Sequence, residues 1–231
     1  MKKIITGNFE IHHELISGLT HLIWAGIVFL GMIYIGHTAQ HHGQNSYWPV
    51  MTFMATMFFT FLVSGTYHVF PHGRRMKDIL QRVDHALIYF LIVGTHHAIV
   101  NLVLRDENSL FWLKILWTVA FLGALIKLFR VNIKWWLSVG IYMLLGLIAV
   151  VKLDALYVYM EEPAFYLLIA GGACYLIGVI FYVWEELRGK DSDEEWLHVI
   201  FHIFIILGSA GHFLSVLLYL FQLGPWINPG C

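Results

Sequence analysis

The stretch Glu195-Trp-Leu-His198-Val-Ile-Phe-His202 opens the last long apolar run of the chain. From His198 to Leu223 this run contains no Asp, Glu, Lys or Arg, and about 20 apolar residues suffice for a helix to cross a bilayer. His198 and His202 are spaced i and i+4, so they share one face of that helix, roughly 6 Å apart along its axis. Histidines inside a membrane helix are costly unless they face protein, water or metal, and this spacing suits a metal ion. The stretch therefore predicts a membrane fold and a metal site.

The composition of the whole chain agrees with a membrane protein. Of 231 residues, 59% are hydrophobic and only 13% are charged, more apolar surface than a soluble domain of this size can bury. The formal net charge of -1 argues against nucleic acid as a partner. The two cysteines, Cys174 within an apolar run and Cys231 at the end, provide no disulfide framework.

Seven apolar runs have the length of a membrane span, and the connections between them are short. The sequence therefore predicts an all-α, seven-transmembrane helix bundle that forms a single domain over residues 1–231. The predicted helices are approximately 15–36, 48–70, 84–104, 110–129, 133–152, 163–185 and 197–223.

The distribution of Lys and Arg predicts how the bundle is oriented. Cytoplasmic connections of membrane proteins are enriched in these residues. Eleven lie at the N-terminus and in the second, fourth and sixth connections, and three lie on the opposite side: Arg105, Lys114 and Lys152. We therefore expect a multi-pass protein of the inner (plasma) membrane, with its N-terminus in the cytoplasm and its C-terminus outside.

With this topology, polar side chains from separate helices converge at the cytoplasmic side. His198 and His202 begin the seventh helix, Ser64 and His68 end the second, and Asp84 begins the third. His68, His198 and His202 would supply three nitrogen ligands and leave a fourth position for water, the pattern of a catalytic zinc site. Asp84 is placed to accept a proton from that water, and Ser64, one turn before His68, to hydrogen-bond it.

Each of these residues also has a purely structural interpretation. The histidines are alternatively residues at the membrane–water interface, in contact with water. Asp84 is alternatively an N-terminal helix residue favoured by the helix dipole, and Ser64 a hydroxyl that packs between helices. Glu14 and His21, seven residues apart on the first helix, share a face and pair with each other or with another helix.

A second polar set lies deeper or toward the outer side. It consists of His96, His97 and Asn101 on the third helix and His212 on the seventh. His212 is about 15 Å further along the helix than His202, too far to bind the same metal. These residues form interhelical hydrogen bonds or, alternatively, steps of a proton path.

The order of these residues resembles a known family. The set Glu14…Thr20-His21, Ser64-x-x-x-His68, Asp84 and His198-x-x-x-His202…His212 is similar to the progestin and adipoQ receptor (PAQR) superfamily. Its hemolysin III branch is the most similar, because the N-terminus is short and there is no soluble domain. The chain departs from many members at Ser17, where they have Asn.

The resemblance implies a seven-helix bundle with a Zn²⁺ ion near its cytoplasmic side. The family's three zinc histidines match His68, His198 and His202, and its serine and aspartate near the zinc-bound water match Ser64 and Asp84. Adiponectin receptors and the similar alkaline ceramidases are regarded as zinc-dependent hydrolases of lipid amides. For bacterial members the resemblance implies hemolytic activity or a role in membrane homeostasis.

Two functions remain open from the sequence. The first is an intramembrane zinc hydrolase whose substrate, a ceramide-like lipid amide, enters from the inner leaflet, with membrane lipids as partners. The second is non-enzymatic: a membrane sensor, a proton or cation transporter, or a pore, with zinc as a structural element. A pore is poorly supported, because charged residues are nearly absent from the interiors of the apolar runs.

Overall fold

The computed structural model describes residues 2–39, 44–71, 73, 75–129, 133–188 and 196–222. Outside these ranges lie three of the eleven basic residues counted on the cytoplasmic side, namely Arg74, Arg130 and Lys190. Glu195, Leu223 and Cys231 also lie outside them. Seven segments are long and apolar enough to cross a membrane, so the predicted all-α fold with seven spans is confirmed. The side of the membrane on which each end lies remains a prediction.

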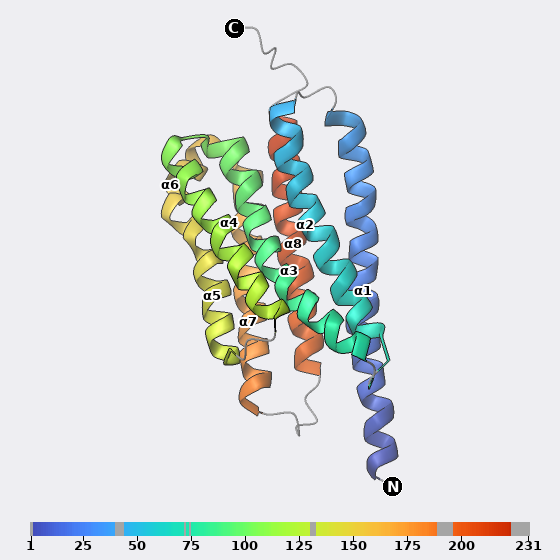
Figure 1. The fold of residues 1–231 in the computed structure, drawn as a ribbon. Coiled ribbons are helices and arrows are strands. Elements are labelled where there is room, and N and C mark those ends of the chain that lie inside the picture. The colour runs from blue at the N-terminus through green and yellow to red at the C-terminus, as the bar shows by residue number, and fades with distance from the viewer. Residues whose placement is uncertain are drawn as a thin grey trace, which may run out of the picture.

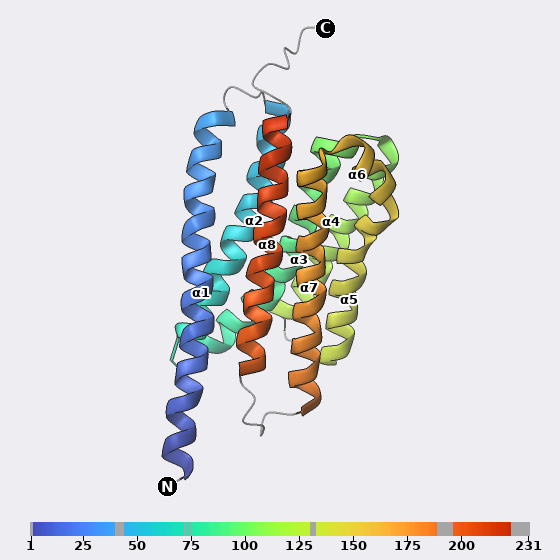
Figure 2. The same cartoon turned by 180° about the vertical axis from the view of Figure 1, so that it is seen from behind.

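The spans consist of the following helices, together with one π-helical and one 3-10 segment: α1 (Lys2–Ala39), α2 (Gln44–Val69), α3 (Arg75–Ile99) with a π-helical end (Val100–Leu104), α4 (Glu107–Leu128), α5 (Trp135–Leu147) followed by a 3-10 segment (Ile148–Lys152) and α6 (Leu153–Tyr159), α7 (Glu162–Arg188), and α8 (Trp196–Gln222). All run roughly along one axis, and the beginning of α1 and the end of α8 lie at opposite ends of the bundle (Figures 1 and 2). The fifth span, predicted over 133–152, thus continues through a 3-10 segment to Tyr159.

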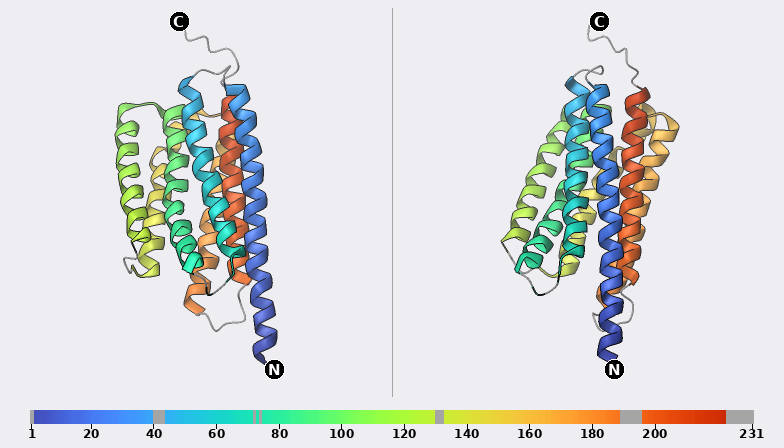
Figure 3. Two further views of the ribbon diagram at one scale, coloured as in Figure 1. Left: turned by 45° about the vertical axis from the view of Figure 1, so that its right-hand side comes forward. Right: turned by 90° about the vertical axis from the view of Figure 1, so that its right-hand side faces the viewer.

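α3 and α8 lie at the centre of the bundle. α3 contacts α2, α4, α5 and α8, whereas α8 contacts α1, α2, α3 and α7. Figure 3 shows α1, α2 and α8 together on one side and α4 and α5 on the other. This arrangement brings the end of α2 beside the beginning of α8, where the histidines of both helices lie.

α3 begins at Arg75, nine residues before the predicted start at residue 84. Hydropathy detects only the apolar part of a helix, and the first turns of α3 are rich in charge. The acidic Asp78 lies in the first turn, where it interacts favourably with the helix dipole. Asp84 is consequently inside the helix, and its interpretation as an N-terminal residue favoured by the dipole is wrong.

α7 and α8 pack closely through glycines. A Cβ atom added to Gly211 would lie 2.9 Å from the Cα of Gly171, and one added to Gly171 would lie 2.7 Å from the carbonyl oxygen of Gly208. Small residues permit this approach of two membrane helices. Small residues also recur every four positions along α7, at Ala170, Cys174 and Gly178, a spacing that predicts a helix contact face. Only part of this row is such a face, because Gly178 is buried but Ala170 is exposed.

Candidate metal centre

Three histidines from two helices meet at one end of the bundle. His68 lies in the last turn of α2, and His198 and His202 lie in the first two turns of α8. One ring nitrogen of each lies within 4.8 Å of those of the other two. The Nε2 atoms of His198 and His202 are 2.9 Å apart, as the i, i+4 spacing on one helical face permits. The predicted ligand set is therefore close enough to hold a metal ion.

His198 has a carboxylate partner on its other ring nitrogen. Its Nδ1 lies 2.9 Å from Oε2 of Glu185, near the end of α7. A carboxylate accepts hydrogen bonds, so the His198 Nδ1–H donates and Nε2 is left with its lone pair toward the other histidines. Carboxylate–histidine pairs of this kind orient metal ligands. Glu185 was missed in the sequence, where the only signal was an acidic pair, Glu185-Glu186, closing the run before His198.

One of the three histidines has an unsatisfied ring nitrogen that a metal could bind. Nδ1 of His68 is buried and has no hydrogen-bond partner among the described residues. A buried ring nitrogen without a partner is costly, and a metal ion would satisfy it. Three imidazoles with a fourth position open are typical of catalytic zinc sites, although imidazole suits several divalent metals.

Two of the three histidines are buried, and the third is partly exposed. His68 and His202 are 6% and 4% exposed, whereas the His198 side chain is 31% exposed. Of the three histidines, His198 is therefore the one in contact with the surroundings of the bundle.

Asp84 and Ser64 lie next to the histidines and contact each other. Both side chains are buried, and the Ser64 hydroxyl is a hydrogen-bond partner of the Asp84 carboxyl. Ser64 is one helical turn before His68 on α2. The structure thus brings together all five residues that the sequence proposed as metal ligands or catalytic groups.

His21 of α1 reaches the same centre. Its Nδ1 lies 3.0 Å from Oγ of Ser64, and Nδ1 of His202 lies 2.7 Å from its Nε2 and 3.2 Å from its Nδ1. The sequence left open whether His21 pairs with Glu14 or with another helix, and the structure gives it partners on α2 and α8.

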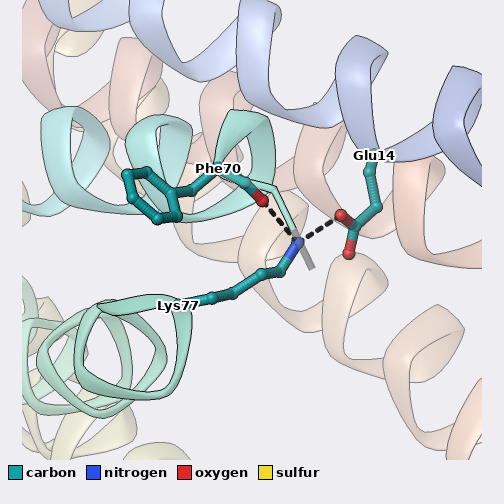
Figure 4. Close-up of polar contacts among 3 residues, drawn as sticks. All are labelled: Glu14, Phe70 and Lys77. Carbon is teal, nitrogen blue, oxygen red and sulfur yellow. Dashed lines mark hydrogen bonds and ion pairs between the residues drawn. The ribbon is translucent and has the colours of Figure 1, made fainter. Parts of the chain in front are cut away.

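Glu14 instead joins α1 to α3. Its carboxylate binds the ammonium of Lys77, which also donates to the carbonyl oxygen of Phe70 at 3.1 Å (Figure 4). Lys77 is only 6% exposed, although the sequence counted it as one of the cytoplasmic basic residues of a loop. Its ammonium lies where α2 ends, and a cation there interacts favourably with the helix dipole.

The second polar set is separate from this centre and forms hydrogen bonds within and between helices. Nε1 of Trp117 on α4 donates to Nδ1 of His97 on α3 at 3.3 Å, and Nε2 of His212 donates to the carbonyl oxygen of Leu168 on α7 at 3.2 Å. Asn101 donates to the carbonyl oxygen of His97 within α3 and its π-helical end. These contacts account for most of the set as interhelical or local bonds.

Comparisons with known proteins agree with the family resemblance of the sequence motifs over nearly the whole chain. The sequence model of the family described as Haemolysin-III related matches residues 9–213. The chain is 30% identical to the hemolysin-3 homolog of Bacillus subtilis (strain 168) over 91% of its length and 96% of that protein. It is 31% identical to hemolysin-3 of Bacillus cereus over 90% of its length and 92% of that protein.

A plant protein is also similar to the chain, at a lower sequence identity. The chain is 25% identical to heptahelical transmembrane protein 1 of Arabidopsis thaliana over 92% of its length and 71% of that protein. With seven spans and bacterial relatives that it matches over more than nine-tenths of their length, the chain is a multi-pass membrane protein, for which the inner membrane is the fitting location. It belongs to the haemolysin-III related family, the branch of the PAQR superfamily that its motifs resemble.

Proposed function

We propose that this protein is a zinc-dependent hydrolase of a ceramide-like lipid amide, with its N-terminus in the cytoplasm and its metal centre at the inner leaflet. The observation that carries the proposal is the approach of three histidine ring nitrogens to within 4.8 Å of one another beside an acid and a hydroxyl. His68, His198 and His202 would hold the metal, and Ser64 and Asp84 would serve the reaction. Zinc, when bound, supplies Lewis acidity that polarises a carbonyl and makes water a better nucleophile at neutral pH.

The roles of the protein side chains follow from their chemistry. Asp84 accepts a proton as water attacks the amide carbon, and it returns the proton to the leaving amine as the C–N bond breaks. The products are a fatty acid and an amine, so atoms and protons balance without another reactant. Ser64 holds the Asp84 carboxyl by its hydrogen bond. The 31% exposure of His198 supports entry of a lipid from the side.

The first test measures the metal content of the purified protein by elemental analysis. We expect about one zinc per chain in the wild type and in His97→Ala, a control that removes a histidine outside the centre. We expect the zinc to be lost in His198→Ala. Wild-type protein that retains no metal after careful preparation would contradict the proposal.

The second test separates chemistry from metal binding. In Asp84→Asn the metal content should stay at the wild-type level, while hydrolysis of a fluorescent short-chain ceramide in nanodiscs should fall to background. If the variant loses zinc and activity together, Asp84 is a structural residue and not the general base.

Proton transport is a second candidate, and one observation favours it. Nε2 of His96 and Nδ1 of His212 are buried acceptors without a hydrogen-bond partner in the described part of the chain. Two such atoms in the membrane-spanning region suit bound water on a proton path. Proton flux into liposomes that disappears in His212→Ala would favour this function, and a flux-silent wild type would exclude it.

A further inference from the structure

His21 is held in one place between the metal centre and Ser64. Its side chain is 3% exposed, and its ring packs edge-on against Phe61 with the ring centroids 4.9 Å apart. On one side its Nε2 is 2.7 Å from Nδ1 of His202, and on the other its Nδ1 is 3.0 Å from Oγ of Ser64. Both ring nitrogens of His21 are thus engaged within the protein.

His21 lies outside the group of three histidines that could hold the metal. Among the described residues, the one group of three possible ligands with atoms mutually within 4.8 Å consists of His68, His198 and His202, without His21. Nδ1 of His21 contacts Ser64, and its Nε2 contacts Nδ1 of His202, the ring nitrogen opposite the Nε2 that faces His198. Its position is that of an outer partner, which would be joined to a bound metal only through its hydrogen bond with His202.

The hydrogen bonds from His202 to Asp84 can run in only one direction if His202 binds metal through Nε2. A neutral imidazole has one donor and one acceptor, so His202 Nδ1–H donates to Nε2 of His21. Nδ1–H of His21 then donates to the Ser64 oxygen. The remaining Ser64 proton is available to the Asp84 carboxyl, its other partner.

His198, the other histidine of α8 in this group, has a different kind of hydrogen-bond partner. His198 is oriented by the carboxylate of Glu185 at 2.9 Å, whereas His202 is oriented by an uncharged imidazole. His21 therefore fixes the tautomer and ring angle of His202 without adding negative charge, and it also connects this ligand to the residue proposed as the base.

We propose that His21 is a positioning residue that orients His202 for metal binding and aligns Ser64 with Asp84. This inference rests on the metal site of the proposed function. It does not require that the protein be a hydrolase, because any role that needs the metal needs His202 in the same orientation.

The test compares zinc affinity, measured by competition with a chromophoric chelator in detergent, across three variants. His21→Phe removes both nitrogens at similar volume, and we expect a loss of about 10- to 100-fold, as is typical when an outer partner of a metal ligand is removed. His21→Gln keeps an acceptor for His202 and a donor for Ser64, so it should recover most of that loss. His97→Phe, the matched control, should bind zinc like the wild type.

The visible spectrum of the Co²⁺-substituted protein gives a readout that a merely structural change would not move. We expect the ligand-field bands of His21→Phe to differ from those of the wild type and His21→Gln to resemble it. Thermal unfolding of the metal-free proteins checks that the fold is intact. If His21→Phe does not fold, His21→Asn, whose side chain is too short to reach His202, takes its place beside His21→Gln.

The outcomes separate this inference from the proposed function. A wild type that binds zinc with the same affinity and Co²⁺ spectrum as His21→Phe overturns the role of His21 alone. A wild type without any divalent metal overturns the proposed function and this inference together. Zinc binding that depends on His21 in a protein without hydrolase activity supports this inference and contradicts the hydrolase.

Discussion

The buried ion pair between Lys77 and Glu14 predicts a specific loss of stability. The Lys77 ammonium lies 2.5 Å from Oε2 of Glu14, 3.1 Å from the Phe70 carbonyl oxygen and 5.2 Å from the centre of the Tyr67 ring. It thereby connects α1, the end of α2 and the start of α3, next to His68. Replacing Lys77 with Met removes the charge and keeps much of the side-chain volume.

The expected magnitude follows from the burial of the two partners. Breaking a fully buried pair by removing one partner costs about 3–5 kcal/mol. Here the Lys77 side chain is 8% exposed but that of Glu14 is 28% exposed, so water compensates part of the loss. We therefore expect Lys77→Met and Glu14→Gln each to lower the free energy of unfolding by about 2 kcal/mol, with a coupling of about 1 kcal/mol between them.

Unfolding in mixed dodecyl maltoside–SDS micelles, followed by far-UV circular dichroism, measures these differences. Lys152→Met is the matched control, because Lys152 pairs with Asp106 at 3.8 Å and both side chains are well exposed at 34% and 44%. Such an exposed pair contributes little to stability, because solvent screens the two charges. Equal effects of Lys77→Met and Lys152→Met, or strict additivity of the Lys77 and Glu14 variants, would refute the reasoning.

Two further perturbations test the connection before α4 and the contact between α7 and α8. Asp106, outside the membrane spans, caps α4, and hydrogen bonds from the Ser109 hydroxyl and N–H lower its pKa below 3.8. The stabilisation by the ionised Asp106 carboxylate is therefore fully present above pH 3.8, and it is lost as the pH falls through the lower folded-state pKa. The difference in the free energy of unfolding between the wild type and Asp106→Asn should accordingly vanish at acidic pH. Gly211→Ala places a Cβ 2.9 Å from the Cα of Gly171 and should cost about 1–3 kcal/mol in the same micelle assay. Gly172→Ala, with nothing within 4 Å, should be nearly neutral, and a Gly211→Ala protein as stable as the wild type would contradict the close packing.

The seven spans and the group of three histidines could both be predicted from local patterns in the sequence. Long apolar runs are a local property, because each span must satisfy its own backbone in the bilayer. The i, i+4 spacing placed His198 and His202 on one face, and the alternation of spans put His68 at the same depth. Three limits were misplaced. α3 begins nine residues before the predicted start, since hydropathy does not detect the charged turns from Arg75 to Arg82. In addition, α1 begins at Lys2 instead of residue 15, and the fifth span ends at Tyr159 instead of residue 152.

The tertiary structure decided which side chains surround the triad. His21 meets His202 across 181 residues, and Glu14 meets Lys77 across 63. Helices in a bilayer are apolar on both their lipid-facing and their protein-facing sides, so the pattern of residues does not reveal which face of each turns inward. The rotation of every helix about its axis is set by packing against its neighbours, and that rotation places Glu185 and His21 beside His198 and His202 and Lys77 in the interior.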